Sequence, residues 1–373
     1  MLENRLLTPV AAVLASFLAT SLSVRLENDE VRAADFEIVN DAFGDVHLKV
    51  LRNVHTNESV SVIYDFGGRI EDIELLSKRS GKLKSMIWTH SRNATAVREN
   101  ESWRGQILLP YANRVKRGIY EFQKTFYRLP IADYQLHHAM HGLLFNQTLT
   151  VVEQSVDKED GALLVLGYNF TGEDLGYPFR LHVLLDYMLR SDGFYFRVHA
   201  RNAMEREPLP FHVGWHPYFL VSDVSKAIVM FDNSTLWNHV DVTNNSNVYT
   251  DLIPTGLTHL WDNFTRGAPI GGDMGNPTFY DDESKATMPR QLLRNISSTI
   301  FDPVTGDRTV LTQDGLVFPF VHVYTGGVGR WGVHAVAVEP MSGMADCYNN
   351  MNDLVVLNGQ QTWVGEFNVK LTD

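Results

Sequence analysis

An apolar run near the end of the chain ends on a carboxylate, and this pattern indicates chemistry. Val336-Ala337-Val338 is followed directly by Glu339 and then by Pro340. A buried carboxylate is costly unless it has a partner or a task. Burial also raises the pKa of a carboxyl group, which suits a general acid or base near neutral pH. Glu339 is therefore a candidate acid/base residue.

A histidine set among aromatic residues is the second candidate. His216 lies in the segment 211–219, directly after Trp215 and close to Tyr218. Imidazole gives or takes a proton near neutral pH. A third segment of the same kind, residues 109–115, places Asn113 and Arg114 in apolar surroundings. Each segment alone is more often a core polar residue with its hydrogen bonds satisfied. Three of them together favour a site with aromatic walls and a few polar groups, as a sugar requires.

Histidine spacing also raises a metal site as a minor alternative. His212 and His216 are four residues apart, and His137, His138 and His141 form a second cluster. The first pair spans a glycine, is followed by proline and lacks the glutamate of a helical zinc motif. The chain has no P-loop, no G-x-G-x-x-G and no G-x-S-x-G motif. The sequence therefore predicts no metal and no cofactor.

Short β-rich runs separated by turns must position these residues. Residues 179–185 and 194–200 predict a hairpin with an Asp-Gly turn at Asp192-Gly193. Residues 317–324 and 333–338 read as strands, whereas 70–76 could form at most a short amphipathic helix. Many short strands predict an all-β protein, a large antiparallel β-sandwich or barrel. With no linker after residue 35, a single domain is expected over 36–373.

Composition and charge exclude several classes of protein. The chain has 373 residues, 44% of them hydrophobic and 20% charged, which argues against disorder and a multi-span membrane protein. A net charge of -12 without a dense basic patch disfavours nucleic acid, and more weakly a phosphorylated ligand. Cys347 is the one cysteine, so an internal disulfide or a cysteine-based zinc site is excluded; a buried spectator thiol is expected.

The N-terminus predicts export. Residues 6–24 are mostly apolar, with Arg5 before them, so residues 1–24 resemble a signal peptide or, alternatively, a signal anchor. Membrane association is expected only if this segment is retained. Nine Asn-X-Ser/Thr sequons exceed the roughly three expected by chance. They lie at Asn57, Asn93, Asn100, Asn146, Asn169, Asn233, Asn244, Asn263 and Asn295. A secreted or lumenal glycoprotein is the simplest prediction.

Taken together, the motifs resemble the aldose 1-epimerase (galactose mutarotase) family. They occur in the family's order over roughly residues 60–371, and the ordered set is more specific than any one piece. The pieces are Gly67-Gly68-Arg69-Ile70, the segment from Tyr111 to Phe122, His138-x-x-His141-Gly142, Gly214 to Phe219, Ile253 to Gly256, and Val338 to Met341 with Asp346 and Asn349.

The resemblance implies the family's large antiparallel β-sandwich, a supersandwich, and roles for particular residues. The family's catalytic glutamate falls on Glu339, as a base, and its acid histidine on His216. Its Asn-Arg motif falls on Asn113 and Arg114. Its other histidine falls on His141, with His138 as a rival. The substrate-binding aspartate is not placed cleanly. Its candidates are Asp281 and Asp282, then Asn276, with Asp273 a poorer fit.

The implied activity is that of an isomerase which interconverts the anomers of a small free sugar without a cofactor. Two alternatives stay open: a hexose-6-phosphate 1-epimerase, and a non-catalytic mutarotase-like protein that binds glycans. A glycoside hydrolase would need a second placed carboxylate, for which the sequence has no motif. No pattern indicates an oligomeric state or the physiological sugar.

Overall fold

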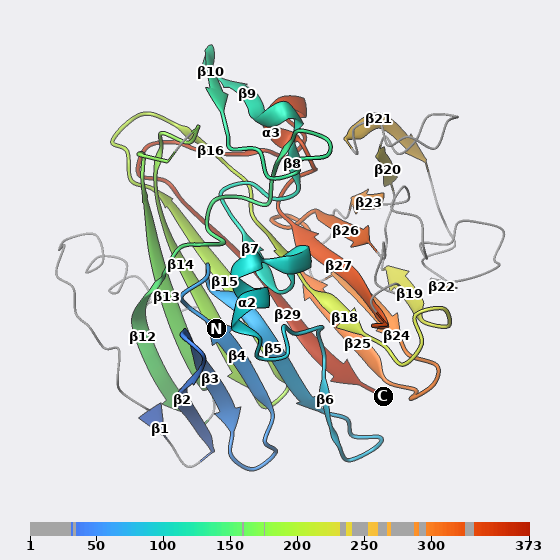
Figure 1. Cartoon of the computed structure of the whole chain (residues 1–373). Coiled ribbons are helices and arrows are strands. Elements are labelled where there is room, and N and C mark those ends of the chain that lie inside the picture. The colour runs from blue at the N-terminus through green and yellow to red at the C-terminus, as the bar shows by residue number, and fades with distance from the viewer. Residues whose placement is uncertain are drawn as a thin grey trace, which may run out of the picture.

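The computed structural model describes residues 31–32, 35–158, 160–174, 176–231, 236–240, 253–259, 267–269, 287–290, 296–324 and 332–373. Within these residues every pair of hydrogen-bonded strands is antiparallel, and three main sheets account for most of the strands (Figure 1). The N-terminal sheet consists, in order, of β1 (Val31–Arg32), β2 (Phe36–Phe43), β3 (Val46–Asn53), β4 (Ser59–Ile63), β5 (Arg69–Leu76) and β6 (Leu83–Ser85).

The second sheet contains the longest strands and packs against the first. Its order is β12 (Thr150–Asp157), β13 (Gly161–Thr171), β14 (Arg180–Arg190), β15 (Gly193–Asn202), β29 (Thr362–Thr372), β25 (Arg308–Gln313), β24 (Ile296–Phe301), β19 (Ile228–Phe231) and β22 (Ala268–Pro269). Strands β2 and β3 contact β12 to β14, and β5 contacts β29. The two sheets are therefore the layers of a sandwich.

The third sheet carries the residues of interest. Its order is β21 (Pro254–His259), β20 (Leu236–Val240), β23 (Thr287–Arg290), β26 (Phe320–Tyr324), β27 (Ala335–Met341), β17 (Gly214–His216) and β7 (Gln106–Leu108), and β18 (Tyr218–Leu220) also pairs with β27. In Figure 1 this sheet lies beside the sandwich. Strand β27 pairs with β26 along one edge and with β17 and β18 along the other.

Two-stranded ribbons and short helical pieces complete the described part of the fold. The two-stranded ribbons are β8 (Arg114–Val115) with β11 (Ala139–Met140), β9 (Ile119–Phe122) with β10 (Thr125–Arg128), and β16 (Leu209–Phe211) with β28 (Val355–Leu357). The helical pieces are α2 (Ala94–Glu99), η1 (Glu101–Trp103), η2 (Lys116–Gly118) and α3 (Cys347–Asn350). Among the described residues, no helix is long and apolar enough to span a bilayer.

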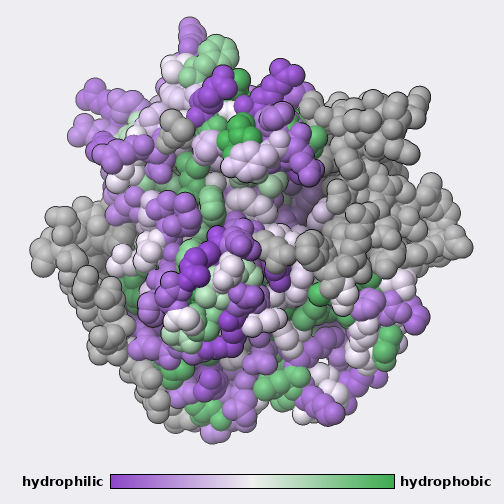
Figure 2. Space-filling model, in the orientation of Figure 1, coloured by the Kyte–Doolittle hydropathy of each residue, from purple (hydrophilic) through white to green (hydrophobic). Residues whose placement is uncertain are grey.

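The core lies between the first two sheets. Every second residue of β14 from Leu181 to Leu189 is completely buried in the core, and the opposite face of the strand is buried as well between residues 184 and 188. Trp215 is also fully buried and stacks on Phe367 with 5.1 Å between the ring centroids. Hydrophilic residues predominate on the described surface in Figure 2, with smaller apolar patches among them.

Two local predictions need correction. The predicted hairpin is confirmed as β14 and β15, but Gly193 pairs with Arg190, so Ser191 and Asp192 form the two-residue turn. Residues 70–76 form strand β5 and no helix. Ile73 and Leu75 are buried in a strand's alternation, and a β-bulge opposite Ser61 and Val62 resets that alternation between Ile70 and Ile73. Strand β5 pairs with both β4 and β6. Pairing on both edges outweighs a weak local helical pattern. A single domain over 36–373 stays a prediction.

Candidate active site

Strand pairing brings Glu339 and His216 together. Gly214 of β17 pairs with Met341 of β27, and Tyr218 of β18 pairs with Ala337. The two pairs continue one register across Pro217, so His216 lies opposite Glu339. Directly opposed residues of antiparallel strands point to the same face of the sheet. His216 Nε2 lies 3.6 Å from Glu339 Oε1.

The strand on the other side of β27 adds a third titratable group. His322 of β26 pairs with Glu339, so it projects from the same face of the sheet. Glu339 is thereby flanked by an imidazole on each neighbouring strand. From the sequence, His322 is expected only to lie on a strand. The sequence nevertheless contains a pattern that could have identified His322 as a candidate. It is a single polar residue within the apolar run 320–324, and a polar residue in an apolar run is also what indicates Glu339.

His141 joins this group from the segment after the β8–β11 ribbon. Arg114 pairs with Met140, and the amide of His141 donates to the carbonyl of Asn113 at 3.0 Å. The imidazole rings of His141 and His216 pack edge to face, with 5.2 Å between centroids. The next residue, Gly142, has φ +88°, and a Cβ there would lie 2.2 Å from a backbone oxygen of residue 109. Only glycine permits this close approach.

Asn113 and Arg114 lie at the edge of the same group. Asn113 is buried at φ 51°, a left-handed conformation that asparagine tolerates, and its Oδ1 accepts from the Arg114 amide at 2.9 Å. The Arg114 Nε donates to Asp133 Oδ2, also at 2.9 Å. The amide of Asp346 donates to the Arg114 carbonyl. The arginine is thus held from both its backbone and its side chain.

Burial shifts the pKa values of the acid/base residues in opposite directions. Burial raises the pKa of Glu339 well above its ordinary value, and the nearby charge of Arg114 partly opposes this. Burial lowers the pKa of His216 to about 3. Burial, followed by the charge of Arg114, lowers the pKa of His322 to about 3 as well. Because desolvation disfavours the charged form of each group, the neutral forms are the stable ones here.

Four buried polar atoms in this group have no hydrogen-bond partner among the described residues. They are Glu339 Oε2, His216 Nδ1, His141 Nδ1 and His322 Nδ1. Buried polar groups are normally paired, so such a concentration is typical of a site that binds polar ligand atoms.

The remaining histidine candidates have structural partners. His138 is completely buried, and its Nδ1 accepts from the Arg117 amide at 3.0 Å. His212 Nδ1 lies 3.3 Å from both the Ala112 amide and the Cys347 thiol. Within the described part of the chain no group of three or more His, Cys, Asp or Glu residues is placed to hold a metal. The candidates Asp281, Asp282, Asn276 and Asp273 lie outside the described residues.

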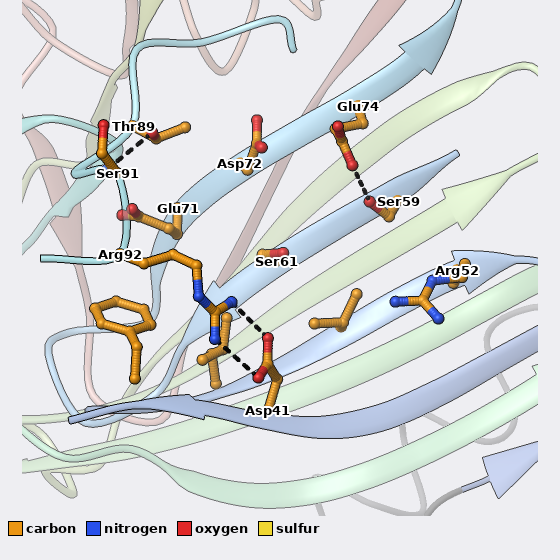
Figure 3. Close-up of a pocket in the computed structure, with 13 residues that line it drawn as sticks. Asp41, Arg52, Ser59, Ser61, Glu71, Asp72, Glu74, Thr89, Ser91 and Arg92 are labelled. Carbon is orange, nitrogen blue, oxygen red and sulfur yellow. Dashed lines mark hydrogen bonds and ion pairs between the residues drawn. The ribbon is translucent and has the colours of Figure 1, made fainter. Parts of the chain in front are cut away.

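A separate polar depression opens on the outer face of the N-terminal sheet (Figure 3). Its volume is about 230 Å³, and it contains several carboxylates. These are engaged locally: Asp41 pairs with Arg92, Glu71 with His90, and Glu74 with Ser59. Each of these three carboxylates thus has a hydrogen-bonding partner within the protein.

Comparison with known proteins shows to which family the chain belongs. The family profile described as Aldose 1-epimerase matches residues 50–370. The chain belongs to the aldose 1-epimerase family. This match covers every element that carries Glu339, His216, His141 and Arg114.

The three proteins compared with this family member differ from it widely in sequence. It is 29% identical over 259 residues to the uncharacterized protein YihR of Escherichia coli, an alignment that covers 68% of this chain and 74% of YihR. It resembles a galactose mutarotase-like protein from Clostridium acetobutylicum with a TM-score of 0.70 and 17% identity, covering 91% of this chain and 100% of that one. Galactose 1-epimerase from Lactobacillus acidophilus gives a TM-score of 0.69 and 16% identity, covering 91% and 99%. These likenesses confirm the predicted fold.

Proposed function

We propose that this protein is an aldose 1-epimerase that interconverts the α and β anomers of a free hexose such as galactose or glucose. The observation that carries the proposal is the 3.6 Å separation of His216 Nε2 and Glu339 Oε1 on one buried face. The anomeric hydroxyl and the ring oxygen are bonded to the same carbon. A base and an acid that serve both oxygens must therefore be close neighbours.

The proposed reaction needs one proton removed and one supplied. Glu339 takes the proton of the anomeric hydroxyl, and the electron pair of that O–H bond forms the second bond of the carbonyl. The bond from the anomeric carbon to the ring oxygen breaks, and its electron pair stays on the ring oxygen. His216 gives its proton to that oxygen. Rotation about the bond between the first two carbons precedes closure, when both proton transfers reverse. Each acid/base group typically contributes about 10²–10⁴-fold. Arg114 and His141 would hold neighbouring oxygens.

The pKa shifts make Glu339 and His216 a pair that shares one proton. Because the pKa of the carboxyl is raised and that of the imidazole is lowered, the pair binds one proton over a wide pH range. The resting form has the proton on Glu339. Transfer of this proton to His216 produces the carboxylate base and imidazolium acid that ring opening requires. The positive charge of Arg114 favours the ionised carboxylate.

A neutral sugar fits better than a phosphorylated one. The Arg114 guanidinium is already paired with Asp133, so part of its charge is offset within the protein. The chain as a whole has a net charge of -12. A phosphate would require further cationic contacts. We therefore rank a hexose-6-phosphate 1-epimerase below an enzyme for free aldoses.

Polarimetry on freshly dissolved α-galactose and α-glucose tests the proposal. The optical rotation should decay faster than the spontaneous rate, in proportion to the protein concentration. Decay at the spontaneous rate with sugar binding retained would instead support the glycan-binding alternative. Acceleration restricted to glucose 6-phosphate would support the phosphorylated substrate.

We also propose that the protein is made in the secretory pathway and is secreted or lumenal, with residues 1–24 as a signal peptide or membrane anchor. The excess of sequons supports this location. Asn57, Asn93, Asn146 and Asn169 are exposed, as glycan acceptors must be.

A further inference from the structure

Trp103 occupies an unexpected position beside the candidate active site. Its ring lies against the buried imidazole of His141, with 4.9 Å between centroids and a tilt of 54°. The ring also packs against Phe145 at 5.1 Å. Trp103 itself is partly exposed, whereas His141 is only 5% exposed. The indole therefore flanks the site while retaining accessible surface.

The backbone around Trp103 is strained. Asn100, Ser102 and Trp103 all have left-handed conformations, with φ of 51°, 56° and 55°. Such conformations cost non-glycine residues free energy and persist only where the surroundings hold them. Gly105 is left-handed as well, and a Cβ there would lie 1.9 Å from the Ile70 carbonyl oxygen. Contacts outside the segment must hold this conformation.

Arg69 supplies those contacts from strand β5. It is completely buried, and each of its three guanidinium nitrogens is engaged. Nη2 donates to Asn100 Oδ1 at 2.6 Å, and Nη1 donates to the Val97 carbonyl at 3.2 Å. Nε donates to Gln106 Oε1 at 3.0 Å. One side chain thus binds the segment before, within and after the strained turn.

The charge of Arg69 is balanced through a histidine. An arginine can only donate, so His90 Nε2, 3.1 Å from Arg69 Nη1, must be the acceptor. His90 Nδ1 then carries the proton and donates to Glu71 Oε2 at 2.7 Å. Glu71 also accepts from the His90 amide. Its carboxylate lies at the wall of the outer depression, and it fixes the tautomer that Arg69 needs (Figure 3).

The far end of the segment is fastened to the strand of the proposed acid. The Gly105 amide donates to the His216 carbonyl at 2.9 Å, and Gln106 pairs with His216 in the sheet. Arg69 therefore hydrogen-bonds to residues on both sides of Trp103, one of which, Gln106, lies on the strand that pairs with β17. The proposed chemistry does not use the motif Gly67-Gly68-Arg69-Ile70. The hydrogen bonds of Arg69 give this motif a structural role beside the site.

We propose that Trp103 is the aromatic wall that receives the apolar face of the sugar ring beside His141, and that buried Arg69 is the positioning residue that holds Trp103 there. This inference rests on the proposed function, because it assumes that the site binds a sugar. An indole face offers a large, rigid apolar surface at low conformational cost. The ring contact to His141 places that surface next to the groups that would bind hydroxyls.

Steady-state kinetics of Trp103→Ala and Trp103→Phe test whether Trp103 contacts the sugar. Trp103→Ala should raise KM for the sugar by roughly tenfold, the size expected of one aromatic contact, and change kcat much less. Trp103→Phe should restore most of the affinity. Trp363→Phe is the matched control, since Trp363 is also partly buried but contacts Phe211 and Phe318. An unchanged KM in Trp103→Ala would overturn the assignment.

A double-mutant cycle tests Arg69. Arg69→Lys keeps the charge but loses the planar fork, so it should raise KM like Trp103→Ala and add nothing in the Trp103→Ala background. If the effects of the two substitutions on KM are additive, Arg69 does not act through Trp103. If Arg69→Lys does not fold, Asn100→Gly replaces it, because glycine keeps the left-handed backbone and deletes the acceptor. Arg92→Lys is the control, since that arginine points across the outer depression to Asp41 (Figure 3).

Two readouts separate this inference from the proposed function. The ring current of Trp103 should shift the imidazole proton resonances of His141 in NMR spectra, and Trp103→Ala and Arg69→Lys should both reduce that shift. Titration calorimetry with galactose and glucose measures binding without turnover. If the wild-type protein is inactive but its sugar binding weakens in Trp103→Ala, the epimerase activity is refuted and the role of Trp103 in sugar binding is supported. If the wild-type protein is active and sugar binding is unchanged in Trp103→Ala, the epimerase activity is supported and the role of Trp103 is refuted. A wild-type protein that binds neither sugar would overturn both the proposed function and the role of Trp103.

Discussion

His216 Nε2 lies 3.6 Å from Glu339 Oε1, although 122 residues separate them in the chain and each side chain is at least 94% buried. This separation is beyond a hydrogen bond but short enough for the two groups to share a substrate oxygen or a proton. The relationship follows from the pairing of β17 and β18 with β27 on either side of Pro217.

Glu339→Gln should abolish nearly all catalysed anomer exchange, with a loss of about 10²–10⁴-fold. Glutamine has the same shape and cannot take the hydroxyl proton. The fold should persist, because the change removes a buried ionisable group without altering volume. Polarimetry gives the rate, and circular dichroism with thermal unfolding checks the fold. Substantial activity in a folded Glu339→Gln protein would contradict the assignment.

The pH–rate profile should have a broad plateau. With ordinary pKa values, a carboxylate base and an imidazolium acid would work best between about 4.3 and 6.5. Here burial lowers the pKa of His216 to about 3 and raises that of Glu339, so the one-proton form of the pair covers a wider pH range than ordinary pKa values would give. After subtraction of the spontaneous rate, kcat/KM should be similar at pH 5.5 and 7.5. A decline centred near pH 6.5 would show that an unshifted histidine controls the reaction.

Acidification should destabilise the protein through its buried histidines. The pKa values of His212, His216 and His322 are all lowered by burial to about 3, so the unfolded chain binds their protons first. The stability due to these groups is complete above their unfolded pKa of about 6.5 and is lost as the pH falls toward 3. Glu339, whose pKa is raised, acts in the opposite direction above pH 4.5.

His322→Gln should reduce this pH dependence, since one fewer proton is taken up on unfolding. Each histidine contributes at most about 1.4 kcal/mol per pH unit. Urea unfolding at pH 7 and pH 5 measures the difference in the free energy of unfolding. An equal difference in wild type and variant would mean that His322 is not buried in its neutral form.

Asp133→Asn should weaken sugar binding through Arg114. Asp133 Oδ2 accepts from Arg114 Nε, while Oδ1 accepts from the Leu136 amide. Asparagine can keep the second contact, so the turn should survive while the arginine loses its ionic partner. KM should rise by roughly tenfold, as expected for a hydrogen bond to a charged group. Rescue by Asp133→Glu would support positioning; an unchanged KM would remove Asp133 from the site.

Glycosylation should follow exposure. Asn57, Asn93, Asn146 and Asn169 are exposed, but Asn100 is only 8% exposed and its side chain accepts from Arg69. A glycan on Asn100 would break that contact. Expressed in a secretory host, the protein should lose mass on treatment with an N-glycosidase, and peptide mapping should find Asn100 unmodified. No change in mobility would argue against the secretory location.

Much of the candidate site was predictable from local sequence. Glu339 is conspicuous as a carboxylate directly after an apolar run, and His216 and Arg114 each lie in a short motif. His322 carries the same signal as Glu339, a lone polar residue in a buried run. The all-β class follows from strand alternation and turns, both of which depend on neighbours within a few residues. These features are local, so one chain suffices to see them.

Only the tertiary structure decided which of these residues meet. The register of three adjacent strands places His216 and His322 on either side of Glu339. A hydrogen bond from Arg69 buries the sequon asparagine Asn100 and turns Trp103 toward His141. No local pattern encodes these contacts, because a strand's partners and the tertiary neighbours of a strained turn are chosen by the burial of surfaces far apart in the chain. Sequence alone thus indicated the chemical groups, and the packing of the sheets determined their geometry.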